Sequence, residues 1–224
     1  MKRVFRKSTA VLLVAAAATV GVAVATAGVK HKTAAAQVCV LLPDTKSSVR
    51  WEQFDRPAFA KALKAAGVTS TIVNALNDAQ KQISQANQCL ANGAKVVIIT
   101  SLDAGSSIAI QKAAAAKGAK TIDYDREIVG GTGSIYVSFD GHAVGVLQGK
   151  GVVAGLKANG KYGSHPVVAE LNGGATDNNS FLFKGGYDSI LKPLYSKGTL
   201  KKGPDQFVPF LSVPFEYSGL RIES

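Results

Sequence analysis

Asp125 and Arg126 stand side by side at the end of residues 119–124, a stretch that predicts a short buried strand. An ionised carboxylate beside a guanidinium group offers charge-assisted hydrogen-bond acceptors and donors that can hold vicinal hydroxyl groups. A hydrogen bond to a charged group contributes about 1.5–3 kcal/mol, so these two side chains can supply much of the affinity for a small polar ligand. An ordinary surface turn is the alternative interpretation of this pair.

Other polar and aromatic side chains follow the predicted strands in the same way. They are Asp44, Arg50, Trp51, Asn77, Ser101 and Asp103. An indole ring can cover the apolar face of a sugar ring, while guanidinium, carboxylate and amide groups bind its hydroxyls. The set therefore indicates a carbohydrate site, with ordinary core packing as the alternative for Trp51. Asn178 and Asn179, in a later amide-rich loop, are either ligand contacts or simple turn and helix-cap residues.

Strands and helices alternate along the chain, and this alternation would bring those side chains together. The predicted strands cover residues 38–42, 69–74, 96–100, 119–124, 134–139 and 166–171. The predicted helices cover about residues 55–66, 78–93, 106–117, 140–159 and 180–191. The first helix has Asp55 as a candidate cap and Pro57 in its first turn.

A recurring glycine marks the end of each of the first three helices. Gly67, Gly93 and Gly118 are 26 and 25 residues apart, and each supplies the left-handed turn that leads into a strand. A solenoid of stacked repeats is the alternative, but the strands are too apolar for an exposed stack. The pattern predicts an α/β fold: a parallel sheet with right-handed crossovers and helices on both faces. Ligands bind at the carboxyl edge of such a sheet.

The basic charge of the chain is concentrated near its start. The formal net charge is +11, and residues 1–36 contribute six basic residues and no acidic one. The remaining lysines are scattered without interleaved aromatic residues, so no nucleic-acid partner is expected. The basic start, the apolar residues 10–27 and the small residues that follow predict an export signal peptide, cleaved after Ala27 or Ala36. An uncleaved membrane anchor is the alternative.

Export changes the interpretation of Cys39 and Cys89, because thiols pair in oxidising compartments. If the second strand lies outside the first, the second helix crosses back over the first strand, and both cysteines reach the amino edge of the sheet. A disulfide between them is therefore expected, with two buried thiols as the alternative.

Signatures of catalysis are lacking in the sequence. It contains no glycine-rich phosphate loop, no G-x-S-x-G elbow and no metal-ligand spacing, and His31, His142 and His165 are scattered. We therefore expect no enzyme, no metal site and no cofactor. The glycines of residues 130–133 predict a flexible loop between two strands.

Taken together, these residues resemble the type I periplasmic sugar-binding proteins of ABC importers, and within them the xylose-binding branch. The matching segments are residues 50–51, 124–126, 138–140, 144–148, 173–174, 177–179 and 191–193. The resemblance implies that Arg50, Trp51, Asp125, Arg126 and Asn179 contact the sugar. It implies the same for Asp44 more weakly, because Pro43-Asp44 stands where the family often has paired acids.

The resemblance also implies a domain organisation and partners. Residues 37–140 would form an amino-terminal sugar-binding lobe and residues 141–208 part of a second lobe. Residues 209–224 match nothing in the family pattern, so we expect an aberrant tail and a truncated second lobe. The implied function is reversible binding of a monosaccharide, xylose or a related pentose, by an exported monomer. Its partners would be ABC permease subunits and a chemoreceptor. The alternatives are the sensor core of a sugar-responsive regulator and a non-functional fragment.

Overall fold

The computed structural model describes residues 37–208. The predicted signal peptide, residues 1–36, and the predicted aberrant tail, residues 209–224, lie outside the described residues. Within the described part, no helix is long and apolar enough to cross a membrane.

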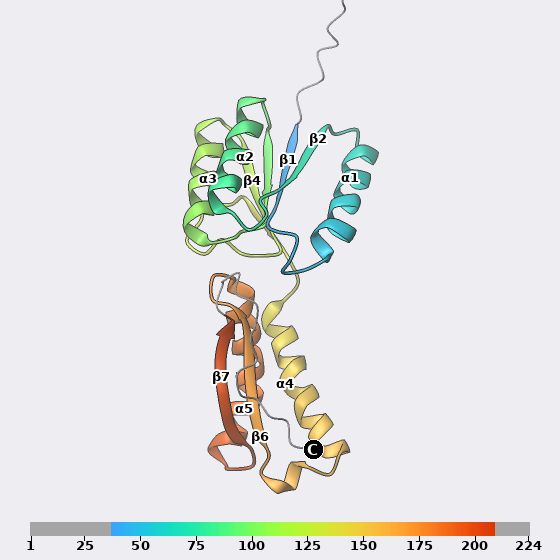
Figure 1. Cartoon of the computed structure of the whole chain (residues 1–224), viewed down its shortest axis with the longest axis vertical. Coiled ribbons are helices and arrows are strands. Elements are labelled where there is room, and N and C mark those ends of the chain that lie inside the picture. Colours follow the sequence, from blue (N-terminus) through green and yellow to red (C-terminus); the bar gives the residue numbers. More distant parts are fainter. Residues whose placement is uncertain (1–36, 209–224) are drawn as a thin grey trace, which may run out of the picture. The chain divides into compact units, whose positions relative to one another are not determined.

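A parallel sheet of five strands forms the first part of the fold, in the order β2-β1-β3-β4-β5 (Figure 1). Its strands are β1 (Val38–Leu42), β2 (Ser70–Asn74), β3 (Val96–Ile99), β4 (Lys120–Tyr124) and β5 (Ile135–Val137). Its helices are α1 (Arg56–Ala65), α2 (Ala79–Ala91) and α3 (Ala104–Ala116). Helices α2 and α3 cover one face of the sheet and α1 the other (Figure 1). The predicted α/β sheet, with the second strand outside the first, is confirmed.

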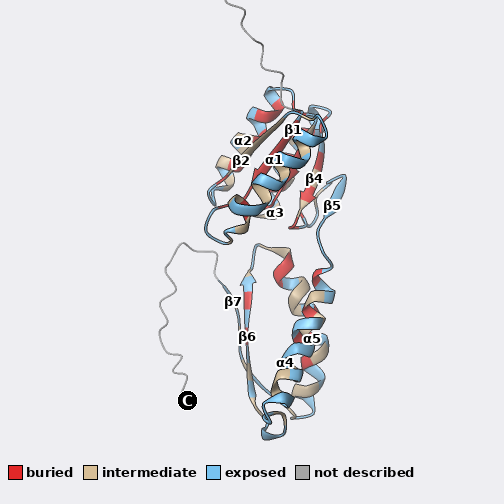
Figure 2. Cartoon of the chain, turned by 90° about the vertical axis from the view of Figure 1, so that its right-hand side faces the viewer, coloured by how far each residue is buried: buried red, intermediate tan, exposed pale blue. Residues whose placement is uncertain are grey.

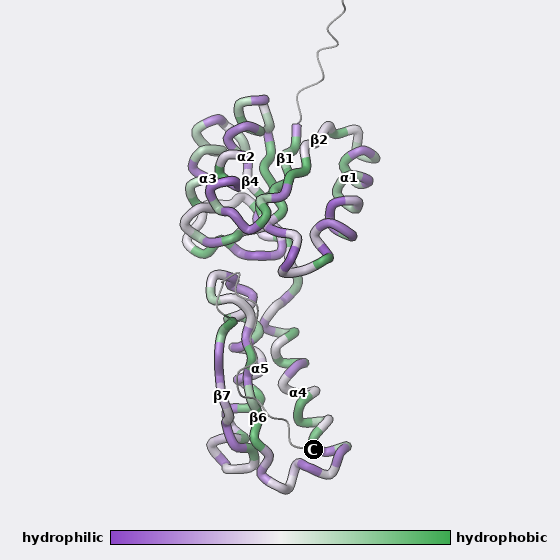
Figure 3. The backbone as a smooth tube through the Cα atoms, in the orientation of Figure 1, coloured by the Kyte–Doolittle hydropathy of each residue, from purple (hydrophilic) through white to green (hydrophobic). Residues whose placement is uncertain are grey.

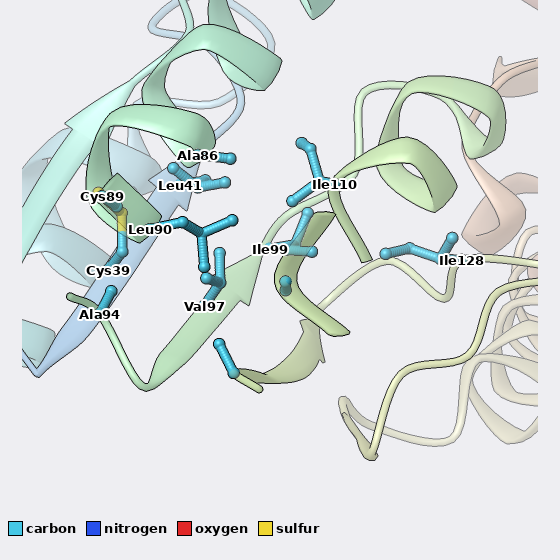
Figure 4. Packing of buried hydrophobic residues seen from close by; sticks show 12 residues of the cluster. Cys39, Leu41, Ala86, Cys89, Leu90, Ala94, Val97, Ile99, Ile110 and Ile128 are labelled. Carbon is cyan, nitrogen blue, oxygen red and sulfur yellow. A yellow bond between two sulfur atoms is a disulfide. The ribbon is translucent and has the colours of Figure 1, made fainter. Parts of the chain in front are cut away.

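Every residue of β1 is buried, because this strand lies inside the sheet and is covered on both faces. Leu41 packs with Val97, Ile99 and Leu90 on the side of α2 and α3 (Figure 4). Each such buried side chain contributes about 1.5–3 kcal/mol. Hydrophobic residues predominate along the inner strands of the sheet, whereas hydrophilic and hydrophobic residues alternate along α1 (Figure 3). Burial is accordingly densest in the sheet (Figure 2).

The cysteines of β1 and α2 form a disulfide. Cys39 and Cys89 are bonded, with their Cα atoms 6.0 Å apart, and both are buried (Figure 4). The predicted bridge is confirmed, and the alternative of two free thiols is wrong.

The second part of the fold pairs two helices with a parallel two-stranded sheet. Its elements are α4 (Gly141–Ala158), β6 (Val167–Gly174), α5 (Asn178–Ser196) and β7 (Lys201–Val208). The sequence predicted β6 but ended it three residues early, and it did not predict β7, whose Gly203 and Pro204 are poor strand formers. Helices α4 and α5 pack closely because Gly145 has no side chain: a Cβ atom there would collide with the carbonyl oxygen of Phe183.

Two local expectations were wrong. Asp55 does not cap α1, because the chain is already helical there, in a π-helical turn over Trp51–Asp55; its carboxylate accepts a hydrogen bond from Arg50 instead. Helix α3 begins at Ala104 rather than near residue 106, because Asp103 is its cap and accepts a hydrogen bond from the N–H of Ser106.

The glycine-rich loop after β4 is anchored rather than flexible. The carboxylate of Asp123 accepts hydrogen bonds from Gln111 Nε2 (2.8 Å) and the N–H of Ile128 (3.3 Å). The N–H of Thr132 donates to Gln111 Oε1 (2.6 Å). A Cβ atom at Gly133 would lie 2.5 Å from Asp123 Oδ1, so only glycine allows this approach. Burial raises the pKa of Asp123, and these hydrogen bonds oppose that rise.

Candidate functional site

Of the five residues that the family resemblance places on the sugar, four are buried, although three of these four are polar or charged. Trp51 is 3 % exposed, Asp125 7 %, Arg126 8 % and Asn179 6 %. They come from the π-helical turn before α1, from the end of β4 and from the first turn of α5. Buried polar groups are almost always hydrogen-bonded, because burial without a partner costs free energy. The contacts of these residues, and any atom left without a partner, therefore show which groups could bind a ligand.

The carboxylate of Asp125 joins two of the other predicted residues. Arg50 Nη2 donates to Asp125 Oδ1 at 2.8 Å, and Arg50 Nε donates to Asp55 Oδ2 at 2.9 Å. Asn179 Nδ2 donates to the carbonyl oxygen of Asp125 at 3.0 Å and lies 3.5 Å from its Oδ2. Burial lowers the pKa of Arg50, but its bonds to Asp55 and Asp125 outweigh this and hold the pKa above its ordinary value. Arg50 is therefore a fixed cation in this group.

Arg126 is held by backbone and by a second carboxylate. Its Nη1 donates to the carbonyl oxygen of Ser101 at 3.0 Å, and its Nε lies 2.9 Å from Asp177 Oδ2. The surface-turn interpretation of Asp125 and Arg126 is thus wrong, because both side chains are buried in a polar network. Such a fixed guanidinium can bind hydroxyl oxygens with the N–H groups that these partners leave free.

Trp51 lies beside the two arginines rather than in the apolar core. The guanidinium carbon of Arg50 is 4.3 Å from the centre of its ring system, and that of Arg126 is 5.6 Å away. The indole Nε1 donates to Ser47 Oγ at 3.3 Å. The sequence predicted that this ring would cover a sugar; in the structure guanidinium groups lie over it, which orients them by cation–π attraction.

Asp44 and Asn178 have other partners. The carboxylate of Asp44 is 3 % exposed and accepts hydrogen bonds from the N–H groups of Lys46 and Ser47 and from Ser47 Oγ. Asp44 therefore folds the loop that carries Trp51. Asn178 is half-buried, and its Nδ2 donates to Glu127 Oε2 at 2.9 Å.

The remaining residues expected at the sheet edge act locally. Ser101 contributes its backbone carbonyl to Arg126, and its hydroxyl donates to the carbonyl of Asp103. Asp103 caps α3, and Asn77 lies exposed in a turn with φ of 69°. In the described residues these three positions therefore serve the local backbone.

Asp177 is a residue that the sequence analysis did not single out as part of the site. Its carboxylate caps α5, accepting a hydrogen bond from the N–H of Asn179 at 3.0 Å, and also pairs with Arg126. Burial raises the pKa of Asp177, and the charge of Arg126 opposes that rise. The cap was recognisable as an Asp before a helix start, but the ion pair joins residues far apart in the sequence and had no local signal.

One buried acceptor in this group has no partner. Asn179 Oδ1 makes no hydrogen bond within residues 37–208, although Asn179 is almost fully buried. An unsatisfied buried polar atom costs about 1–3 kcal/mol, which a hydroxyl donor from a ligand would recover. The described residues contain no group of three or more His, Cys, Asp or Glu side chains suited to a metal ion. The arrangement offers fixed hydrogen-bond donors and acceptors to a polar ligand.

Comparison with known proteins shows to which family of proteins the chain belongs. The family described as "Periplasmic binding protein domain" matches residues 38–209, more than half of the chain. The chain belongs to this family. Its fold is shared by an ABC transporter solute binding protein from Clostridium phytofermentans with bound β-D-glucose, at 34 % identity and a TM-score of 0.66, covering 73 % of this chain and 50 % of that one.

Two relatives illustrate the resemblance in sequence. The multiple sugar-binding periplasmic receptor ChvE of Rhizobium radiobacter is 36 % identical over 85 % of this chain and 53 % of its own length. The D-xylose-binding periplasmic protein of Escherichia coli strain K12 is 31 % identical over 71 % of this chain and 46 % of its own length. The chain spans about half the length of these relatives. By their names these relatives are periplasmic proteins that bind sugars.

Proposed function

We propose that this chain binds a monosaccharide reversibly, as the extracytoplasmic solute-binding component of an ABC sugar importer. The observation that carries the proposal is the buried group of Asp125, Arg126 and Asn179 beside Trp51, in which Asn179 Oδ1 lacks a partner. Charged acceptors and donors fixed by their neighbours bind neutral hydroxyls without reorganising, which reduces the entropy lost on binding. The names of the relatives support the same class of ligand.

Pentoses, with D-xylose first, are the proposed ligands, and hexoses such as D-glucose are the next to test. The xylose-binding relatives support the first group, and the glucose-bound structural neighbour supports the second. The predicted residues take these roles: Asp125 and Asn179 accept sugar hydroxyls, and Arg50 and Arg126 donate to sugar oxygens. Trp51 orients both arginines. Asp44 and Asn178 support the loops around the site.

The partners and location follow from the same family. We propose that the chain is exported, acts as a monomer and delivers its ligand to ABC permease subunits; a chemoreceptor is a second proposed partner. Residues 37–140 and 141–208 are proposed as the first lobe and part of the second. Fractionation of expressing cells, with sequencing of the amino terminus of the exported protein, tests the export step.

Isothermal titration calorimetry of the full chain tests the ligand. We expect saturable heat with D-xylose or D-glucose and none with sucrose, a disaccharide of similar polarity. Arg126→Lys keeps the charge but removes the planar donor group, and we expect binding to weaken at least about ten-fold. Arg56→Lys is the matched control, because Arg56 bonds to Glu52 and to the Ile72 carbonyl outside this group. Absence of heat with a panel of pentoses and hexoses contradicts the proposal.

A further inference from the structure

The backbone at Asp125 is in a conformation that non-glycine residues rarely adopt. Its φ angle is 66°, and the N–H of Arg126 donates to the carbonyl oxygen of Tyr124 at 2.8 Å. A hydrogen bond that spans three residues with positive φ at the centre defines a strained γ-turn. Such strain persists only where the surroundings hold it, and it gathers at functional sites. Here it falls on the central carboxylate of the candidate site.

Three donors from different segments hold the carbonyl oxygen of this strained residue. Tyr136 Oη donates to it at 3.2 Å, Ser138 Oγ at 3.0 Å and Asn179 Nδ2 at 3.0 Å. The N–H of Asp125 is also held, because it donates to the carbonyl of Val137 at 2.9 Å. A carbonyl oxygen has two lone pairs, so three donors saturate it and fix the orientation of the peptide group between Asp125 and Arg126.

The two hydroxyl donors lie outside the apolar core of the sheet. Tyr136 is 39 % exposed and Ser138 is exposed, and neither belongs to the two apolar clusters of the sheet. Ser138 lies in the short segment between β5 and α4, next to the strand that carries Tyr136. Their shared feature is the bond to the Asp125 carbonyl.

We propose that Tyr136 and Ser138 are positioning residues of the ligand site. By holding the Asp125 carbonyl, their hydroxyl groups keep the γ-turn closed, and the turn sets the directions of the Asp125 carboxylate and the Arg126 guanidinium. Neither hydroxyl needs to touch the ligand. The inference rests on the proposed function for its effect on sugar affinity, whereas its effect on the turn is measured without any sugar.

The test is the double variant Tyr136→Phe/Ser138→Ala in the full chain, with two readouts. Amide hydrogen exchange by NMR follows the N–H of Arg126, which closes the turn, and calorimetry follows the affinity for D-xylose and D-glucose. Tyr162→Phe/Ser134→Ala is the matched control, because neither hydroxyl group makes a hydrogen bond within the described residues, and phenylalanine keeps the ring that faces Lys157. The variant Tyr136→Phe/Ser138→Thr keeps a hydroxyl group at the second position and serves as the rescue.

We expect the double variant to exchange the Arg126 N–H at least about ten-fold faster and to bind sugar about ten-fold more weakly, with an unchanged urea midpoint. The control pair keeps the wild-type exchange rate and sugar affinity. In Tyr136→Phe/Ser138→Thr, both quantities return most of the way to the wild-type values. Unchanged exchange, or faster exchange with unchanged affinity, overturns the inference. If the wild-type chain binds no sugar, the proposed function fails, and the exchange rate alone decides whether the two hydroxyls hold the turn.

Discussion

The disulfide between Cys39 and Cys89 offers the sharpest test of how the first part of the fold is stabilised. It joins the central strand β1 to helix α2 across a sequence separation of 50 residues. In the chain-entropy model, closing a loop of that size lowers the entropy of the unfolded chain and stabilises the fold by about 4 kcal/mol. The double variant Cys39→Ala/Cys89→Ala should lose most of that stability, which is a large part of the total for a small domain.

Urea unfolding at neutral pH measures this loss, with the fluorescence of the single tryptophan, Trp51, as the reporter. Trp51 is buried in the structure, so its emission should shift when the fold opens. A reducing agent should lower the midpoint of the wild-type protein and leave the double variant unchanged, which separates the bond from any effect of the substitutions. A loss under about 1 kcal/mol in both experiments would refute the reasoning, because it would show an unfolded chain that is already constrained without the bridge.

The remaining predictions concern the second part of the fold. Lys184 pairs with three carboxylates, among them the buried Glu170, so Lys184→Met should lower the free energy of unfolding by about 3 kcal/mol in urea titrations. Hydrogen bonds from Lys184 first, and then Lys202, hold the pKa of Asp205 well below its ordinary value. Its contribution is therefore complete above about pH 4 and is lost as pH falls further, so the urea midpoint of Asp205→Asn should depend less on pH between 5 and 2. Gly145→Ala should destabilise the fold by about 2 kcal/mol or more, while Gly151→Ala, which meets no neighbour, should be neutral or slightly stabilising by thermal melting.

The strand and helix pattern of residues 38–124 was predictable because each element carries its own local signal. The run Val38–Leu42 is apolar on both faces, and the glycines at 67, 93 and 118 all have positive φ, as helix-ending glycines do. β7 escaped prediction because its pairing with β6 outweighs a poor intrinsic preference. The sequence predicted a flexible loop at residues 130–133, because glycine is the least restricted residue. In the structure, Gly131 and Gly133 instead allow the chain to pack closely against Gln111 and Asp123.

The candidate site was likewise predictable from the sequence only in part. Residue type and position at strand ends are local properties, and they indicated a carbohydrate site at this edge of the sheet. The family resemblance then implied Arg50, Trp51, Asp125, Arg126 and Asn179 as the sugar contacts. The structure brings all five together, and in it Asp44 and Asn178 make hydrogen bonds to Ser47 and Glu127.

The sequence by itself determined the class of fold, the family and the chemical character of the site, since periodicity, glycine positions and residue types are written along the chain. Only the tertiary structure decided which partner each polar group meets. The ion pair of Arg126 with Asp177 and the three donors on the Asp125 carbonyl join segments far apart in the chain. Such contacts depend on how the packed elements converge, and no local pattern records that convergence.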